Sequence, residues 1–328
     1  MEFVVHNHSS YPRAGETEAA QRLRRAHTAW ECGDITAADL EAAERVEMTA
    51  IVREQIEAGA DVVTDGQVRW DDPVSGVMRA FDGVRLNGLR RYFDTNFYVR
   101  QPVVTGRVRR RGPIAVGDFR QASAVSQRPV KVALPGPYTL ARLSVLDNAT
   151  YDGVPALAAA LSEGLAAEMA DLAAAGATLV QIEEPAILAH PGDIRLLREL
   201  LEPLWAARGA AQLVVATYFA DAEPLYAQLN SLPADVLALD LSSSPHLLAT
   251  IAATGASKTL ALGLVNGRTA RVEHPADIAR QVETALHRYT LDAVHLMPSC
   301  GLEHVPRATA RAKLHALAAA RRLLAATL

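Results

Sequence analysis

The segment HLMPSCGLEH, residues 295–304, ends an apolar run with a proline and places Cys300 directly before a glycine. A cysteine at such a position is a candidate nucleophile or metal ligand, although a buried cysteine can equally serve packing. A thiol ligand needs partners, and His6 and His8 stand two residues apart, so both imidazoles would point to the same side of a strand. With Asp240 as a further ligand, these residues predict a mixed zinc or iron site. The alternative is an imidazole that hydrogen-bonds substrate or a carboxylate without metal.

Two pairs of polar residues also stand at the ends of apolar runs. Glu183 and Glu184 are consecutive, so they point to opposite faces of a strand. One of them can reach a site while the other caps or pairs at its rim. Asp65 and Gln67 share a face at the end of another run, and Asp65 is a candidate acid or base.

Three further residues could hold an anionic substrate. Ser10 and Arg13 follow the first apolar run, and an arginine can bind a carboxylate through two parallel hydrogen bonds. Arg268 follows a later run, where it could bind an anion or lie exposed beside a helix start. The basic run RVRRRG, residues 107–112, is interpreted as one face of a solvated hairpin.

The elements that must position these residues are short apolar runs separated by long segments of helical period. The eight predicted strands are 3–6, 61–66, 130–136, 178–184, 213–219, 236–242, 259–265 and 293–299. Several are apolar throughout, as parallel strands covered on both faces are. The pattern predicts an α/β fold, a (β/α)8 TIM barrel with its chemistry at the carboxyl ends of the strands. In a closed barrel the first and last strands are neighbours, which would bring Cys300 near the two histidines.

Two insertions interrupt this pattern. About fifty residues separate the first two predicted strands, enough for a helical insertion. Residues 73–129 form a second insertion after the second predicted strand, and its alternating pattern predicts a β-hairpin with turns at Gly106 and Gly112. Such a hairpin could cover the mouth of the barrel. No linker or second core is evident, so residues 1–328 are predicted to be one domain.

Composition excludes several classes of protein. The chain has 328 residues, of which 50% are hydrophobic, and a net charge of −4, which argues against a nucleic-acid partner. Its two cysteines cannot build a disulfide framework and fit a reducing compartment. We find neither a signal peptide nor an apolar stretch long enough to span a membrane. A cytoplasmic protein without membrane contact is therefore expected.

Seven segments, in order along nearly the whole chain, resemble the cobalamin-independent methionine synthase family in its short, single-barrel form. They are SSYPR, TDGQVRWDD, RYFDTNFYV, LPGPYTL, VQIEEPA, GRTAR and PSCGL. The resemblance implies a thiolate alkylation in which zinc activates homocysteine and a folate donates the methyl group. The chemical reason for the metal is that a zinc-bound thiol loses its proton at neutral pH and stays nucleophilic.

Only part of the family's zinc-ligand set has a counterpart here. The cysteine after the last strand corresponds to Cys300, and the glutamate after the sixth strand to the shorter Asp240. The histidine and cysteine after the fifth strand correspond to Ala216 and Tyr218, so Tyr218 is assigned to substrate binding instead. In places the chain is more similar to the non-catalytic half of the long enzymes.

The substrate positions of the family are also altered. The glutamate that would bind the substrate ammonium corresponds to Gln67, and the matching aspartate to Glu183, which could hold the ammonium or act as a general base. The tryptophan that stacks on folate corresponds to Leu143, which argues against a folate donor. The histidine that would relay a proton corresponds to Arg268.

Three functions follow from these observations. The first is methyl transfer to homocysteine or a related small thiol, with a methyl-donor protein or a small methyl compound as donor. The second is different chemistry on the same scaffold, such as a lyase, a decarboxylase or a metal-dependent redox enzyme for a small amino or carboxylic acid. The third is a non-catalytic barrel that serves as a partner module. We favour the first. A barrel that had lost its activity would not keep so many polar groups at the strand ends, where burying an unpaired polar group is costly.

Overall fold

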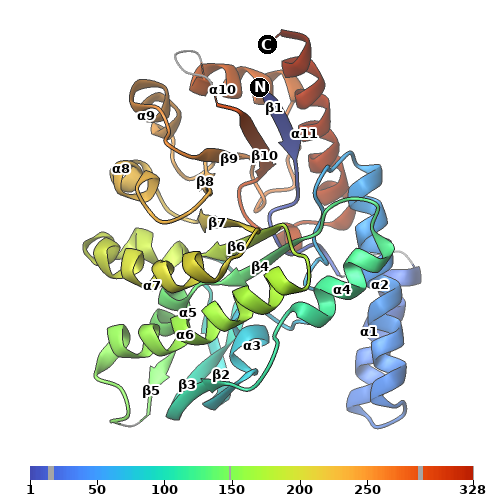
Figure 1. Cartoon of the computed structure of the whole chain (residues 1–328). Coiled ribbons are helices and arrows are strands. Elements are labelled where there is room, and N and C mark those ends of the chain that lie inside the picture. Colours follow the sequence, from blue (N-terminus) through green and yellow to red (C-terminus); the bar gives the residue numbers. More distant parts are fainter. Residues whose placement is uncertain (14–17, 148, 287–290, 328) are drawn as a thin grey trace.

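The central feature of the fold is a curled parallel sheet of seven strands (Figure 1). The structure is a computed structural model that describes residues 1–13, 18–147, 149–286 and 291–327. Neighbouring strands pair in parallel in the order β1, β10, β9, β8, β7, β6, β4. Their bounds are β1 Glu2–Val5, β4 Lys131–Pro135, β6 Leu179–Glu183, β7 Gln212–Thr217, β8 Val236–Asp240, β9 Thr259–Val265 and β10 Ala293–Pro298.

Helices cover the outside of this sheet, which explains why the strands are apolar on both faces. Every residue of β4, β6 and β8 is buried. The long helix α11 packs against β1 and β10, close to both chain ends. The covering helices are α5 Pro137–Leu143, α6 Gly153–Ala174, α7 Ile194–Ala207, α8 Tyr226–Asn230, α9 Leu247–Thr254, α10 Pro275–Leu286 and α11 Arg307–Thr327.

The segment predicted as a strand at 61–66 does not form a regular strand. It makes isolated parallel bridges, Val62 with His6 on one side and Val63 with Val130 on the other. The side-chain amide of Gln55 in α2 takes both backbone groups of Thr64, accepting from its N–H at 3.0 Å and donating to its carbonyl at 2.9 Å. A side chain therefore takes both backbone groups of Thr64, and residues 61–66 pair through isolated bridges rather than as the regular strand that was predicted.

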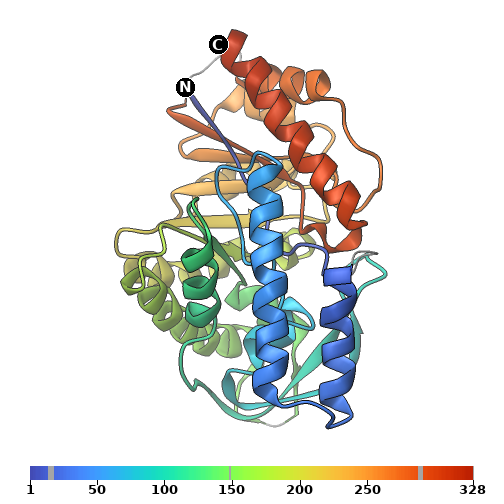
Figure 2. The same cartoon turned by 90° about the vertical axis from the view of Figure 1, so that its right-hand side faces the viewer.

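Two helices fill the interval between β1 and residue 61. Helix α1 (Glu18–Glu31) and helix α2 (Ala37–Glu57) lie side by side (Figure 2). Thr36 begins α2 with a capping box, in which its hydroxyl accepts from the Asp39 N–H and the Asp39 carboxylate accepts from the Thr36 N–H. Within the described ranges, no helix is long and apolar enough to cross a membrane.

A second, three-stranded sheet lies after the 61–66 segment. Strands β2 (Phe81–Arg91) and β3 (Tyr98–Arg110) pair antiparallel, and the short β5 (Val145–Leu146) joins β3 in parallel. Helices α3 (Pro73–Met78) and α4 (Val116–Val125) flank this hairpin in sequence.

The turn predicted at Gly106 is wrong, because Gly106 lies inside β3. It stands opposite Gly83, where the register of the hairpin shifts and φ is +72°. A side chain on Gly83 would meet the carbonyl of Arg107 at 2.5 Å, so these glycines allow a bulge rather than a turn. The chain reverses at residues 92–97, where the Tyr92 N–H donates to the Phe97 carbonyl at 2.9 Å.

The base of the hairpin is tied to α6 by the buried carboxylate of Glu168. This carboxylate accepts from Arg110 Nε at 3.0 Å at the end of β3. It also accepts from the backbone N–H groups of Ile114 at 2.7 Å and Ala115 at 2.8 Å. A charge without solvent exposure is thus satisfied entirely by the segment that it anchors.

Replacing Glu168 by glutamine should destabilise the protein by about 3 kcal/mol, because two backbone N–H groups lose their charged acceptor and the partly buried guanidinium of Arg110 keeps only Asp171. Urea unfolding at pH 7 measures the change. The control is Glu163→Gln, an exposed position on the same helix, which should change stability by less than about 0.5 kcal/mol. Equal losses in the two variants would contradict this role.

Candidate active site

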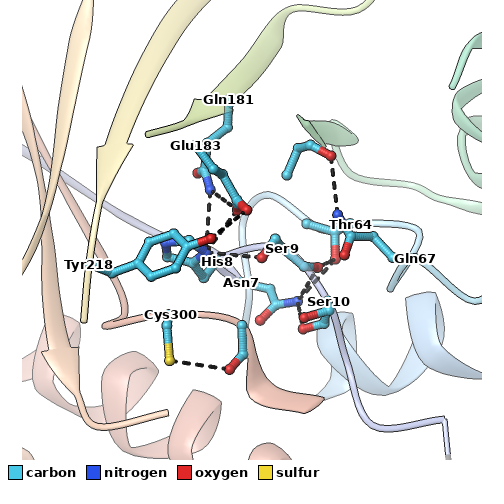
Figure 3. A network of polar contacts seen from close by, with 12 residues as sticks. Asn7, His8, Ser9, Ser10, Thr64, Gln67, Gln181, Glu183, Tyr218 and Cys300 are labelled. Atoms are coloured by element: carbon cyan, nitrogen blue, oxygen red, sulfur yellow. Dashed lines mark hydrogen bonds and ion pairs between the residues drawn. The ribbon is translucent and has the colours of Figure 1, made fainter. Parts of the chain in front are cut away.

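A buried polar network lies at the carboxyl ends of β1, β6 and β7 (Figure 3). We call His8, Gln181, Glu183 and Tyr218 the mouth network. The Glu183 carboxylate accepts from Gln181 Nε2 at 2.9 Å and from the Tyr218 hydroxyl at 2.9 Å. His8 Nδ1 lies 3.3 Å from Glu183 Oε1 and 3.0 Å from Ser9 Oγ. All four side chains are nearly inaccessible to solvent.

The network keeps Glu183 ionised. Burial alone would raise the pKa of this carboxyl, but hydrogen bonds from His8, Tyr218 and Ser9 lower it below its ordinary value. Burial, with Glu183 and Tyr92 nearby, raises the pKa of the Tyr218 phenol well above its ordinary value. Tyr218 therefore remains a proton donor to a carboxylate at neutral pH.

His8 combines an orienting partner with an open nitrogen. Its Nδ1 lies 3.3 Å from both Glu183 Oε1 and Gln181 Nε2, while its buried Nε2 has no hydrogen-bond partner among the residues that the structure describes. In the tautomer with the proton on Nδ1, the imidazole donates to Glu183 and Nε2 presents a lone pair. A carboxylate that orients an imidazole toward a nucleophile is the arrangement by which enzymes activate hydroxyls and thiols.

The consecutive glutamates point to opposite sides, as predicted from strand geometry. Glu184 accepts from the backbone N–H groups of Tyr138 at 3.0 Å and Thr139 at 2.7 Å, so it caps the first turn of α5. Burial raises the pKa of Glu184 to about 7. Glu183 thus joins the mouth network, whereas Glu184 caps a helix on the other side of the strand.

A second polar group, which the sequence analysis missed, fills the interior below the mouth network. The fully buried Lys131 Nζ lies 2.8 Å from His6 Nδ1 and donates to Gln181 Oε1 at 2.7 Å. Burial lowers the pKa of Lys131 well below its ordinary value, and burial together with Lys131 does the same for His6. His295 contacts the His6 ring edge to face at 5.1 Å. The signal was one charged residue inside the apolar run VKVALPG.

A small polar pocket lies beside the segment that follows His8. We call it the Ser10 pocket; it has a volume of about 40 Å³, and its polar lining consists of Ser10, Arg13, Gln67, Asp71, Asp72 and Glu303. The Ser10 hydroxyl donates to Glu303. Ser10, Arg13 and Gln67 were predicted to bind substrate, and the structure brings them together. Glu303 was not predicted.

A wider groove of about 400 Å³ borders the Ser10 pocket, and Phe97 and Glu303 line both. Arg268, also in the groove, donates to the Asp94 carbonyl at 2.6 Å and lies over the Phe219 ring. The tip of the hairpin thus lies over the mouth, and the Tyr92 hydroxyl is 3.0 Å from that of Tyr218.

Backbone strain is concentrated at the same place. In the described part of the chain the non-glycine residues with positive φ are Gln67 at 53°, Phe93 at 51° and Phe219 at 72°. Gln67 belongs to the Ser10 pocket, and the two phenylalanine rings contact each other at the hairpin tip. Residues in this region of φ cost stability and cluster at functional sites.

The residues present do not fit the zinc site that the family resemblance implies. Among the residues described, no three His, Cys, Asp or Glu side chains come together to hold a metal ion. The predicted ligands are separated by other partners, since His6 contacts Lys131 and His8 contacts Glu183. Asp240 accepts from the backbone N–H groups of residues 219, 242 and 243. The expected cluster of His6, His8, Cys300 and Asp240 is not formed.

Cys300 is placed as a packing thiol. Its side chain is buried, and its Sγ donates to the Gly301 carbonyl at 3.5 Å. Burial, followed by the nearby charges of Glu303 and Asp240, raises the pKa of the thiol well above its ordinary value. In Figure 3 it lies apart from Glu183 and His8. The structure therefore favours the packing alternative over a reactive thiolate.

Asp65 is not brought into the mouth network either. Its carboxylate accepts from the Gln67 N–H at 3.2 Å, and burial together with Asp118 in α4 raises its pKa to about 7. The turn at Gly66 and Gln67, both with positive φ, breaks the alternation on which a shared inward face depended. Gln67 itself donates to the Ala133 carbonyl at 3.1 Å.

The fold and the site define an α/β enzyme, with a buried carboxylate–imidazole pair and a polar pocket at the carboxyl ends of parallel strands. The family model described as "Cobalamin-independent synthase, Catalytic domain" matches residues 9–322. The chain therefore belongs to this family, as a methionine synthase-like methyltransferase.

Individual relatives agree with the family. A methionine synthase of Saccharolobus solfataricus is 29% identical over 308 residues, covering 93% of this chain and 90% of that protein. One of Sulfurisphaera tokodaii is 28% identical over 307 residues, covering 93% and 87%. A B12-independent methionine synthase structure from Shewanella, in complex with selenomethionine, has a TM-score of 0.82 at 20% identity and covers 98% of both chains. A putative one from Listeria monocytogenes has a TM-score of 0.74 at 19% identity, covering 98% and 96%.

Replacing Tyr218 by phenylalanine should cost about 1–2 kcal/mol at pH 7, because an ionised buried carboxylate loses a donor. The pKa of Glu183 is lowered in the folded state, so its contribution to stability is complete above the unfolded value of about 4.3 and is lost as the pH falls through the folded value. The destabilisation should therefore persist down to about pH 4 and shrink at lower pH, as urea unfolding between pH 7 and about pH 2 measures.

Tyr226→Phe is the matched control for this prediction, because the buried Tyr226 hydroxyl donates to a neutral acceptor, the Gly255 carbonyl, at 2.7 Å. The loss in the free energy of unfolding caused by Tyr226→Phe should not depend on pH over this range. The same pH dependence in both variants would show that Tyr218 does not stabilise a charge.

Proposed function

We propose that this chain transfers a methyl group to the thiol of homocysteine or a closely related amino-acid thiol. The observation that carries the proposal is the buried Glu183–His8 pair, with His8 two residues before Ser10 of the pocket, in a chain of a family whose relatives are named methionine synthases. The pocket offers a hydroxyl and a guanidinium for a substrate carboxylate, from Ser10 and Arg13. A thiol chain extending from a group held there leads toward the buried pair.

The residues of this chain supply a base for the thiol. A free thiol has a pKa near 8.5, so it is largely protonated at pH 7. In the proposed step His8 Nε2 takes the thiol proton, and Glu183 stabilises the resulting imidazolium. The sulfur then forms a bond to the methyl carbon, and the electron pair of the broken bond leaves with the donor. Tyr218 and Gln181 hold the Glu183 carboxylate in place throughout.

The family's usual metal and donor are not built into this proposal. Zinc, where a family member holds it, would lower the pKa of the bound thiol, but the donor set here does not fit that ion. A folate is also disfavoured, because Leu143 stands at the stacking position and is buried. We propose a methyl-donor protein or a small methyl compound, approaching through the groove beside Phe97 and Arg268.

The proposal extends to the architecture. We propose that segment 61–66 occupies the position of the eighth strand in a (β/α)8 barrel and that residues 1–328 form one domain. Its bridges to both edges of the seven-stranded sheet support this assignment. The hairpin insertion would then cover one side of the barrel mouth with Tyr92 and Phe97.

A second candidate is acid–base chemistry on a small amino or carboxylic acid without methyl transfer. The altered metal ligands favour it, because the same Glu183–His8 pair could abstract a proton from carbon or oxygen. The two functions differ in their need for a thiol, which ligand binding can test.

The first test is the ionisation of bound homocysteine. Binding to the wild-type chain at pH 7 should produce the ultraviolet absorbance of a thiolate, and His8→Gln should remove it while homocysteine still binds. In an assay with a competent donor, we expect His8→Gln to lower the rate by about 10²- to 10⁴-fold. His315→Gln, an exposed position on α11, is the control and should behave as wild type. A thiolate signal that survives in His8→Gln would contradict the role of His8.

A second test concerns metal. Because base and binding residues are all side chains of this chain, exhaustive treatment with a chelator should leave the thermal stabilisation by homocysteine unchanged. At 100 times the dissociation constant that stabilisation is about 2.7 kcal/mol. Loss of the effect on chelation and its return with added zinc would show that a metal holds the thiol.

A further inference from the structure

We infer that Glu303 recognises the ammonium group of the substrate and makes the Ser10 pocket selective for a zwitterionic amino acid. The inference rests on the proposed function, since it names the group that selects the substrate at that site. It concerns a residue after β10, in the segment that follows Cys300.

The position where the family resemblance places an ammonium-binding acid cannot supply one here. Gln67 carries no charge, and its amide nitrogen already donates to the Ala133 carbonyl at 3.1 Å. Glu183 is buried beneath the pocket, and its two oxygens are taken by Gln181, His8 and Tyr218. An ammonium in the Ser10 pocket therefore needs another carboxylate.

Three carboxylates line the Ser10 pocket among the residues described, and two of them serve structure. Asp72 caps α3, accepting from the Ser75 N–H at 2.7 Å and from the Arg100 N–H at 2.9 Å. Asp71 pairs with Arg79 at 2.6 Å and lies 3.7 Å from Arg100. Only the third, Glu303, has a carboxylate with no arginine or lysine partner in the described chain.

The contact between Ser10 and Glu303 is suited to exchange with a zwitterion. The Ser10 hydroxyl donates to Glu303 across the pocket, and Glu303 lines the open groove as well. A ligand ammonium can replace the hydroxyl at Glu303, which frees Ser10 to donate to the ligand carboxylate. Every polar group that the ligand displaces is then satisfied again.

Arg13 completes the recognition of the carboxylate. Its Nη1 and Nη2 donate to the carbonyls of Val68 and Asp71, both at 3.2 Å, which fixes the guanidinium beside the pocket. A guanidinium has five N–H donors, so donors remain for a ligand. A carboxylic acid without the ammonium would leave its own charge next to Glu303, which contacts Ser10 and, at 3.3 Å, His304 but no arginine or lysine in the described chain, and the two negative charges repel.

Gly301 permits this arrangement. A side-chain carbon built at Gly301 would collide both with the Ser10 hydroxyl and with the Glu303 carboxylate. The glycine therefore lets the two groups meet across the pocket. The local sequence Cys-Gly-Leu-Glu is consistent with selection for this contact, and not only for presentation of Cys300.

The test compares two thiols by isothermal titration calorimetry of the full chain under reducing conditions: homocysteine and 4-mercaptobutanoate, which lacks only the ammonium. We expect wild type to prefer homocysteine by roughly 10- to 100-fold, the effect of one hydrogen bond between charged groups. Glu303→Gln should weaken the binding of homocysteine by a similar factor. Its affinities for homocysteine and for 4-mercaptobutanoate should then be nearly equal.

Two control variants test whether the loss of any polar group in the Ser10 pocket has the same effect as Glu303→Gln. Asp71→Asn removes a carboxylate from the same pocket and should keep the preference for homocysteine. Ser10→Ala should weaken the binding of both ligands by the same factor, because Ser10 donates to the carboxylate that both ligands carry. The preference for homocysteine should therefore remain. A loss of preference in Ser10→Ala or Asp71→Asn as large as in Glu303→Gln would overturn the assignment.

The outcomes separate the inference from the proposed function. Wild type that binds homocysteine, with a preference unchanged in Glu303→Gln, would overturn the role of Glu303 and leave the proposed function standing. Wild type that binds neither thiol would sink the proposed function itself, together with the inference built on it.

Discussion

The rest of the site depends on one buried negative charge. Glu183 lies where water cannot reach it, and an isolated carboxylate there would be protonated or would destabilise the fold. Gln181 from the same strand, with His8 and Tyr218 from two other segments, stabilises the charge. In the proposed function the carboxylate also orients His8, so the requirement for stability and the requirement for chemistry coincide. Lys131 extends the arrangement into the interior through Gln181.

The hairpin insertion shapes the mouth above that charge. Its base is fixed by Glu168, and its tip places Tyr92 and Phe97 over the strand ends. Burial of aromatic rings and a few backbone bonds hold the tip, whereas a buried ion pair holds the base. The tip, through Phe97, is the part of the insertion that borders both the Ser10 pocket and the groove.

The family's scaffold is kept, and under the proposed function an imidazole base replaces the metal in activating the thiol. Substitutions to Ala216 and Tyr218 remove metal ligands, and Tyr218 uses its new hydroxyl to support Glu183. Cys300 remains but is packed and protonated. An imidazole base is weaker than a zinc ion at lowering the pKa of a thiol, so this site suits a reactive methyl donor.

The sequence alone determined the alternation of strands and helices, the family, and the opposite directions of Glu183 and Glu184, since these follow from local periodicity and ordered motifs. Tertiary structure decided the rest. In segment 61–66 the side chain of Gln55 binds the backbone of Thr64, so no regular strand forms there. The hairpin reverses at residues 92–97 rather than at Gly106. Periodicity reports backbone preference, but it cannot tell which distant side chain satisfies a backbone group or neutralises a carboxylate. For that reason the predicted metal cluster did not form.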